Sequence, residues 1–235
     1  MNLTHVGWRI YHWLLDLLLP PQCVHCGRVE VWICDRCVSA LPFVSVETCP
    51  RCGRPVVEPG LCSICEENPL HVNPVRSTVL FEGEIRDLIH ALKYRGAASV
   101  ARAVAPHMAV AWQRYGMDAD LLIPVPLHPE REAKRGYNQA YLLAAALSPH
   151  IACPVAPHVL ERVRNTTSQT QLNLEERRQN VTGAFAVVPG LDLSGSKVTL
   201  IDDVATTGST LDACAQMLLQ ANAETVSAFT LARAP

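Results

Sequence analysis

Eight of the ten cysteines in this chain lie between Cys23 and Cys65 and form four C-x-x-C pairs. The pairs are Cys23/Cys26, Cys34/Cys37, Cys49/Cys52 and Cys62/Cys65. A C-x-x-C turn presents two thiolates to one ion, and zinc takes four ligands in a tetrahedron. Four such turns therefore hold two zinc ions. The spacing favours sequential pairing, with the first two pairs in one site and the last two in the other, and an interleaved pairing is the alternative.

Each half of this cysteine block opens with C-x-x-C-G, the shape of a zinc-ribbon knuckle. Gly27 and Gly53 permit a left-handed backbone there, which lets backbone amides reach the thiolates. Disulfides and an iron–sulfur cluster are the competing interpretations of the eight cysteines. Cys153 and Cys214 stand alone in the sequence and are expected to be small buried apolar residues.

The N-terminal segment argues against a secreted, disulfide-bonded protein. Asp16 interrupts its apolar patch, Pro20 and Pro21 close it, and no small-residue cleavage site follows. No stretch reaches the roughly 20 uninterrupted apolar residues of a membrane span. Residues 1–22 are expected to form a short amphipathic helix, because apolar residues recur at helical spacing. We expect a cytoplasmic protein, where thiols stay reduced and hold metal.

Residues 23–66 are expected to form a double zinc ribbon, in which metal takes the place of a hydrophobic core. Residues 1–75 contain five arginines, no lysine and seven acidic residues, and the whole chain has a net charge of −2. This balance excludes a clamp that holds duplex nucleic acid by bulk positive charge, and it leaves a weak case for direct nucleic-acid binding. Recognition of a protein partner or a single strand is the alternative to a purely structural role. Residues 66–74 carry two prolines and are interpreted as a linker to a separate module.

After residue 75 the pattern changes to alternating strands and helices. Apolar runs suited to buried strands span 77–81, 121–125, 198–201 and 225–231. Helical periodicity spans 85–92, 100–112, 140–147 and 210–221. The alternation predicts an α/β fold over residues 75–235, with a mostly parallel sheet and helices on both faces.

The most informative string is KVTLIDDVATTGSTL, residues 197–211. It places Asp202 and Asp203 at the end of an apolar strand and then turns through small residues into a helix. Helix N-termini bind phosphate, and Gly208 lets the backbone approach an anion closely. Hydroxyl donors are supplied by Thr206, Thr207, Ser209 and Thr210. The two carboxylates suit ribose hydroxyls, directly or around Mg²⁺. The plain alternative is that the string only caps a helix.

The string IDDVATTGST resembles the ribose-5-phosphate signature of type I phosphoribosyltransferases. The whole chain resembles the ComF family, in which a zinc ribbon precedes such a domain. Three further strings support this resemblance: HALKYRG at 90–96, IPVP at 123–126 and RGYNQ at 135–139. The resemblance implies a type I phosphoribosyltransferase fold, a site for 5-phosphoribosyl 1-diphosphate (PRPP) with Mg²⁺, and a link to natural competence or DNA uptake.

The remaining site residues follow from the parts of PRPP. The 5-phosphate is assigned to Ala205–Thr210, and by resemblance the diphosphate is assigned to the loop of Pro126, Leu127 and His128. His128 departs from the small residues typical of that loop, so it either contacts diphosphate or caps the loop. Nine basic residues are expected to offset the diphosphate charge or to form a solvated face: Lys93, Arg95, Arg131, Lys134, Arg135, Arg162, Arg164, Arg177 and Arg178. Among these, Lys93, Arg95 and Arg135 are predicted to bind PRPP.

Two polar segments complete the expected site. Residues 162–180 lie where type I enzymes have a mobile hood, and an ordinary surface loop is the alternative. RGYNQ opens a helix, in which Asn138 or Gln139 orients a ligand, or in which Tyr137 simply packs.

The sequence supports two functions that share this site. One is a phosphoribosyltransferase in which Asp202 and Asp203 act on PRPP and the acceptor is unidentified. The other is a non-catalytic scaffold that senses PRPP or ribose 5-phosphate and acts through partners in DNA uptake. A thiol redox protein is disfavoured, because four C-x-x-C pairs in ribbon spacing suit metal better than exchange. The sequence indicates no particular oligomeric state.

Overall fold

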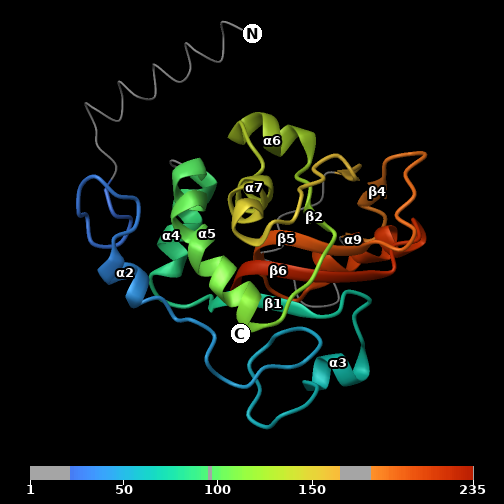
Figure 1. The fold of residues 1–235 in the computed structure, drawn as a ribbon, viewed down its shortest axis with the longest axis horizontal. Coiled ribbons are helices and arrows are strands. Elements are labelled where there is room, and N and C mark those ends of the chain that lie inside the picture. The colour runs from blue at the N-terminus through green and yellow to red at the C-terminus, as the bar shows by residue number, and fades with distance from the viewer. Residues whose placement is uncertain (1–21, 95–96, 165–180, 235) are drawn as a thin grey trace, which may run out of the picture.

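The computed structural model describes residues 22–94, 97–164 and 181–234. Its centre is a four-stranded parallel sheet in the order β1-β6-β5-β2 (Figure 1). The strands are β1 (Val75–Leu80), β2 (Leu121–Pro124), β5 (Lys197–Ala205) and β6 (Thr225–Arg233). All four lie at the apolar runs expected from the sequence, and β5 extends through the two aspartates.

Both faces of the sheet are buried, which explains why the strands read as continuous apolar runs. Side chains alternate along each strand. On β6, Phe229 faces one core cluster and Ala228 faces the other. On β5, Ile201 joins the first cluster and Leu200 the second.

Different helices cover the two faces (Figure 1). The first face carries α4 (Ile85–Tyr94), α5 (Ala97–Arg114) and α7 (Gln139–Ile151). The second carries α9 (Ser209–Gln220), whose apolar side buries Leu211, Cys214 and Leu218. The expected parallel sheet with helices on both faces is confirmed.

Several short elements were not expected from the sequence. Helix α6 (Pro129–Arg135) lies between β2 and α7, and it ends at Gly136, whose φ is 82°. Strands β3 (Leu160–Arg162) and β4 (Phe185–Val187) form an antiparallel pair of their own. Each is only three residues long, too short to show a period of two in sequence.

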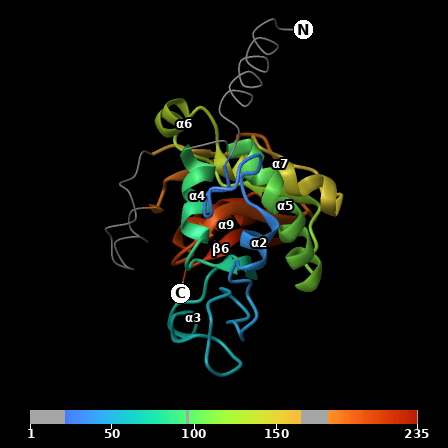
Figure 2. The ribbon, with the colours of Figure 1, turned by 90° about the vertical axis from the view of Figure 1, so that its left-hand side faces the viewer.

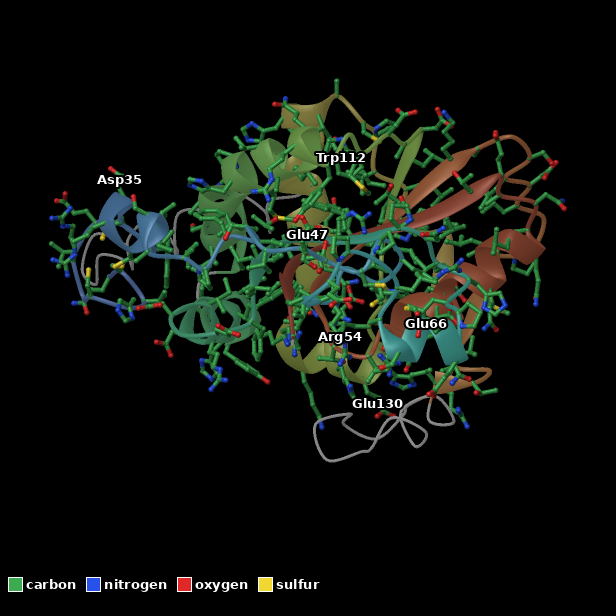
Figure 3. The ribbon with its side chains drawn as sticks, turned by 90° about the horizontal axis from the view of Figure 1, so that it is seen from below. Asp35, Glu47, Arg54, Glu66, Trp112 and Glu130 are labelled. Atoms are coloured by element: carbon green, nitrogen blue, oxygen red, sulfur yellow. The ribbon has the colours of Figure 1, made fainter. Side chains whose placement is uncertain are left out.

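The cysteine block contributes helices α2 (Asp35–Ser39) and α3 (Ser63–Glu67), which lie far apart. Figure 3 shows α2, with Asp35, at one end of the molecule, and α3, with Glu66, at a distance from it. In Figure 2, α2 lies beside α4 and α5. Val38 of α2 belongs to the first core cluster, so the first ribbon packs on that face.

The connection between the two ribbons lies along β1. Phe43 bridges Val79 in antiparallel fashion. Leu80 N donates to Pro42 O at 2.8 Å. In the other direction, Val44 N donates to Thr78 O on β1 at 3.2 Å. The outer side of β1 is thereby covered by residues 42–44.

Residues 66–74 join the two parts of the chain, and the part nearest β1 is packed against the main domain. Val72 is fully buried, and its N–H donates to Asp212 Oδ1 at 3.2 Å. Asn73 N donates to Val226 O at 2.9 Å. Residues 71–73 are therefore held against α9 and β6.

Two expected segments lie outside the described residues: nearly all of the N-terminal helix and most of the hood at 162–180. Among the helices of the described part, none is long and apolar enough to cross a membrane.

The centre of the sheet gives a direct test of core packing. Phe229 is fully buried, and its ring meets Trp112 edge-on with centroids 5.5 Å apart. Replacing Phe229 by Ala should lower the free energy of unfolding in urea by about 3–5 kcal/mol, because it leaves a cavity. Val110→Ala is the control, because Val110 is 66% exposed on α5, and it should change stability by less than about 0.5 kcal/mol. Equal effects of the two changes would contradict this account of the core.

Candidate functional site and metal centres

The structure groups the eight cysteines into two sets of four, paired sequentially as expected. Within each set the Sγ atoms all lie within 4.8 Å of one another. Cys26 and Cys34 have their Sγ atoms 3.6 Å apart, and so do Cys52 and Cys62. Tetrahedral zinc with Zn–S bonds of about 2.3 Å places sulfurs about 3.8 Å apart. Both sets therefore fit structural Zn²⁺, and the interleaved pairing is excluded.

Backbone N–H groups favour the thiolate form of the first cysteine in each set, which is the form that binds metal. Burial acts to raise the pKa of Cys23, but N–H groups of Cys26, Cys34 and His25 outweigh it and lower the pKa to about 6. Cys49 has the same balance, and its pKa is also lowered to about 6. The glycine after each knuckle has φ of 73° or 68°, as the sequence predicts.

Other thiols of the sets behave in the opposite way. Burial, followed by the neighbouring thiols, raises the pKa of Cys37 to about 12. The same two causes raise the pKa of Cys65. Four thiolates so close together repel one another, so all four ionise only around a cation.

A cavity of about 370 Å³ opens at the carboxyl ends of β2 and β5. Its lining comes from six parts of the chain: Lys93, Val125, Pro126, Leu127, Arg131, Arg135, Gln139, Arg162, Asp202, Asp203, Val204, Thr206 and Thr210. Ligands of open α/β sheets bind in this position. Four basic and two acidic side chains line it. The cavity therefore favours an anion that also carries hydrogen-bond donors, such as hydroxyl groups, for the two carboxylates.

The two aspartates differ in their partners. Lys93 Nζ lies 2.6 Å from Asp203 Oδ2, and Gln139 Nε2 donates to Asp203 Oδ1 at 3.5 Å. Gln139 Oε1 accepts from Arg135. Asp202 is paired with no lysine or arginine among the described residues. Asp202 is therefore the carboxylate left to meet a ligand.

Burial, the mutual repulsion of the two carboxylates and the charge of Lys93 push the pKa values of Asp202 and Asp203 apart. Burial raises the pKa of Asp202 well above its ordinary value, and the charge of Asp203 raises it further. Burial acts the same way on Asp203, but the Lys93 ammonium outweighs it and lowers the pKa of Asp203. A proton taken up by the pair therefore resides on Asp202.

The loop between β5 and α9 presents unused backbone donors. Within the described part of the chain, the N–H groups of Thr206, Thr207 and Gly208 have no hydrogen-bond partner. Thr207 Oγ1 accepts from Ser209 N at 3.3 Å and lies 2.8 Å from its hydroxyl. Consecutive free amides before a helix form an anion-binding concavity.

Two features favour glycine at position 208. Its φ is 83°, a left-handed conformation that other residues adopt at a cost. A Cβ there would lie 3.0 Å from Leu70 Cδ1. Leu70 belongs to the segment that follows the second ribbon, so that segment packs against the loop at Gly208.

The residues predicted to bind diphosphate line two neighbouring cavities. Pro126 and Leu127 line the cavity with the aspartates, whereas His128 lines a neighbouring cavity of about 760 Å³. His128 Nδ1 accepts from Glu130 N at 3.3 Å and so caps α6. Arg162 is 9% exposed, and its guanidinium lies 5.3 Å from the centre of the Phe185 ring.

The structure brings together eight of the predicted binding residues at this cavity: Lys93, Pro126, Leu127, Arg135, Asp202, Asp203, Thr206 and Thr210. Arg131 and Arg162 from the basic group join them, whereas Lys134 and Arg164 do not line it. Arg95, Arg177 and Arg178 lie outside the described residues. The other predicted residues of the loop do not line this cavity: Ala205, Thr207, Gly208 and Ser209.

Arg233 was not expected to bear on the site. It ends β6, is 1% exposed, and donates from Nη1 to Ala205 O at 2.9 Å. The sequence signal is an arginine inside the apolar strand TVSAFTLAR. Asn138, by contrast, proves to be the N-cap of α7, accepting from Ala140 N at 2.9 Å. Tyr137 packs there with its hydroxyl donating to Leu92 O at 3.2 Å.

Elemental analysis should return about two zinc ions per chain for protein purified without chelator. Cys37→Ser and Cys65→Ser should each remove about one, because each breaks one four-thiolate set. Tyr141→Phe, at an exposed position on α7, is the control and should keep both. A value of one or none for the unmodified chain, with its thiols shown to be reduced, would contradict the two-site assignment.

Comparison with known families gives two matches on this chain. Residues 14–66 match the double zinc ribbon domain, and residues 136–235 match the phosphoribosyl transferase domain. Among solved structures, a purine phosphoribosyltransferase from Pyrococcus horikoshii Ot3 is 14% identical and covers 56% of this chain and 71% of its own, with a TM-score of 0.35.

Three curated relatives match over most of the chain. DNA utilization protein YhgH of Salmonella typhimurium is 33% identical and covers 92% of this chain and 99% of its own. Competence protein ComFC of Bacillus subtilis is 30% identical, covering 86% of this chain and 84% of its own. Competence protein F of Haemophilus influenzae is 30% identical, covering 91% and 97%. With both domains matched in this order, the chain belongs to the ComF family and combines a double zinc ribbon with a domain of the type I phosphoribosyltransferase fold.

Proposed function

We propose that this protein binds PRPP with Mg²⁺ and transfers its phosphoribosyl group to an unidentified acceptor. One observation carries the proposal: a single cavity is lined by a carboxylate pair, four basic side chains and Thr206, the first of three consecutive residues whose N–H groups have no partner in the described part of the chain. PRPP has a part for each of these, namely a ribose, a diphosphate and a 5-phosphate.

The loop of Thr206, Thr207 and Gly208 is the proposed 5-phosphate site. Its free N–H groups and the N-terminus of α9 supply donors and a positive dipole end. Thr206 and Thr210 line the cavity and add hydroxyl groups.

Asp202 and Asp203 are proposed to accept hydrogen bonds from the ribose hydroxyls. Carboxylate oxygens also suit Mg²⁺, and Asp202, which lacks a basic partner in the described chain, is the residue to hold it. Mg²⁺ bound with the substrate would neutralise charge on the diphosphate oxygens. Asp203, fixed by Lys93 and Gln139, keeps the pair oriented.

Arg131, Arg135 and Arg162 line the same cavity and are proposed to hold the diphosphate. When the bond from ribose carbon 1 to diphosphate breaks, its electron pair leaves with the diphosphate and positive charge develops on the ring, as in glycoside transfer. The carboxylates stabilise that ring, and the arginines stabilise the leaving group. A nucleophile then forms the new bond at carbon 1.

We further propose that the protein acts in the use of external DNA in the cytoplasm. Support comes from the names of the relatives, which are DNA utilization and competence proteins. Two four-thiolate zinc sites suit a compartment in which thiols stay reduced. Partners in DNA uptake are part of this proposal.

Calorimetry with PRPP and Mg²⁺, followed by an assay for diphosphate release with candidate acceptors, tests the central proposal. Binding with release is expected. Binding without diphosphate release, whatever the acceptor, would instead indicate a PRPP-sensing scaffold. Absence of binding would refute both the transferase and the scaffold.

Asp202→Asn should weaken PRPP binding by about 10- to 150-fold in calorimetry. The carboxylate is assigned to charge-assisted hydrogen bonds worth about 1.5–3 kcal/mol. Asp203→Asn should weaken binding as well, but it also removes the charge that pairs with Lys93 and should lower stability. Asp118→Asn, at an exposed acid paired with Lys197, is the control. Unchanged affinity in a folded Asp202 variant would rule out its role.

Thr207→Glu and Gly208→Glu should each abolish protection from thermal unfolding by ribose 5-phosphate, because a carboxylate there repels the 5-phosphate. Gly190→Glu is a matched control: Gly190 has φ of 81°, close to the 83° of Gly208, and is exposed with no heavy atom near its Cβ position. It imposes the same backbone strain and the same charge away from the loop. If the Gly208 variant is folded and still protected, the phosphate site lies elsewhere.

A further inference from the structure

Arg233 connects the second zinc ribbon to the loop before α9. On one side, Nε donates to Cys52 O at 2.9 Å, and Nη2 lies 3.7 Å from Cys52 Sγ. On the other side, Nη1 donates to the carbonyl oxygens of Ala205, at 2.9 Å, and Thr206. One guanidinium thus contacts a zinc-ligand residue, the last residue of β5 and the first residue of the loop.

The charge of Arg233 is offset mainly from the ribbon side. The side chain is 1% exposed, and no described aspartate or glutamate lies within 4.0 Å of it. Burying an unpaired charge is costly. A zinc ion with four thiolates carries a formal charge of about −2, and Cys52 brings that charge to the guanidinium.

The contacts on the loop side determine where its amides point. The carbonyl of one residue and the N–H of the next lie in one peptide plane and point in opposite directions. Because Arg233 holds the carbonyls of Ala205 and Thr206, the N–H groups of Thr206 and Thr207 point away from the ribbon. These are two of the three amides without a partner in the described chain.

We propose that Arg233 is a positioning residue that couples zinc in the second ribbon to sugar-phosphate binding at the loop. With zinc bound, the thiolate set holds the guanidinium, which holds the two carbonyls and so aims the amides at the 5-phosphate. The proposal rests on the 5-phosphate role assigned above. It goes beyond that role because it makes one zinc site, and not the other, part of the ligand-binding apparatus.

Arg233 connects only the second ribbon to the loop, so the zinc ion of the first ribbon is an internal control. The first ribbon reaches the main domain through Val38 in the core and through His25, whose Nε2 lies 3.5 Å from Glu84 Oε1. Within the described chain, no hydrogen bond or ion pair joins the first ribbon to residues 205–210.

Coupling between two sites is reciprocal, so a ligand at the loop must stabilise zinc in the second ribbon. We expect saturating ribose 5-phosphate to raise the affinity of the chain for one of two zinc ions at least about tenfold, measured by competition with a chelator, and to leave the affinity for the other unchanged. Cys37→Ser and Cys65→Ser, which each keep one site, identify which ion responds. If ribose 5-phosphate changed the affinity for neither ion, or changed both affinities equally, the coupling would be overturned.

Arg233→Met tests the residue itself. It removes the donors while keeping most of the side-chain length, so zinc loss from the second ribbon should be faster and loss from the first unchanged. Ribose 5-phosphate affinity should fall at least about tenfold, as for lost hydrogen bonds from a charged group. Arg76→Met is the control for the loop contact, because Arg76 is a partly buried arginine whose charge also acts on Cys49 and Cys52, but it donates to Val75 O at 2.9 Å and contacts no loop residue. It should leave ribose 5-phosphate affinity unchanged.

The two arms separate failure of this inference from failure of the proposed function. If the unmodified protein does not bind ribose 5-phosphate, the proposed function fails, and the zinc-release rates of Arg233→Met still report its contact with the second ribbon. If binding occurs but a folded Arg233→Met or Cys65→Ser keeps full affinity, the coupling is refuted and the function stands.

Discussion

The bond between zinc and four thiolates is the constraint on which the N-terminal third of this structure depends. The cysteine block has too few large apolar residues to fold by burial, so metal coordination supplies the energy that a core would supply elsewhere. The buried cysteines then join the two hydrophobic clusters of the main domain, one set on each face of the sheet. Metal and core are therefore parts of one packing arrangement.

The order of strands in the sheet explains the position of the candidate site. Parallel strands end at one edge, and β2 and β5 are neighbours there, so the loops after them share one cavity. Lys93 reaches this cavity from the end of α4, and Arg135 and Gln139 reach it from α6 and α7. Residues scattered over more than a hundred positions are thus brought together by the order of the strands.

Much of this could be predicted from the sequence, because it depends on local patterns. The C-x-x-C spacing predicts the zinc sets, the apolar runs predict the four strands, and IDDVATTGST predicts the carboxylates and the loop. What could not be predicted depends on contacts between distant parts of the chain. Arg233 lies 181 positions from Cys52, and no local pattern links them. Composition alone also made residues 66–74 look like a linker, whereas their hydrogen bonds to α9 and β6 hold them in place.

The segment at 42–44 has a consequence for solubility. An exposed outer strand of a sheet is a template on which other chains add, and proteins protect such strands by covering them. Here β1 is an outer strand, and the connection between the two ribbons covers it. Both ends of that short cover are anchored by a zinc site. Loss of zinc is therefore expected to release the cover and to leave β1 open to pairing with other chains.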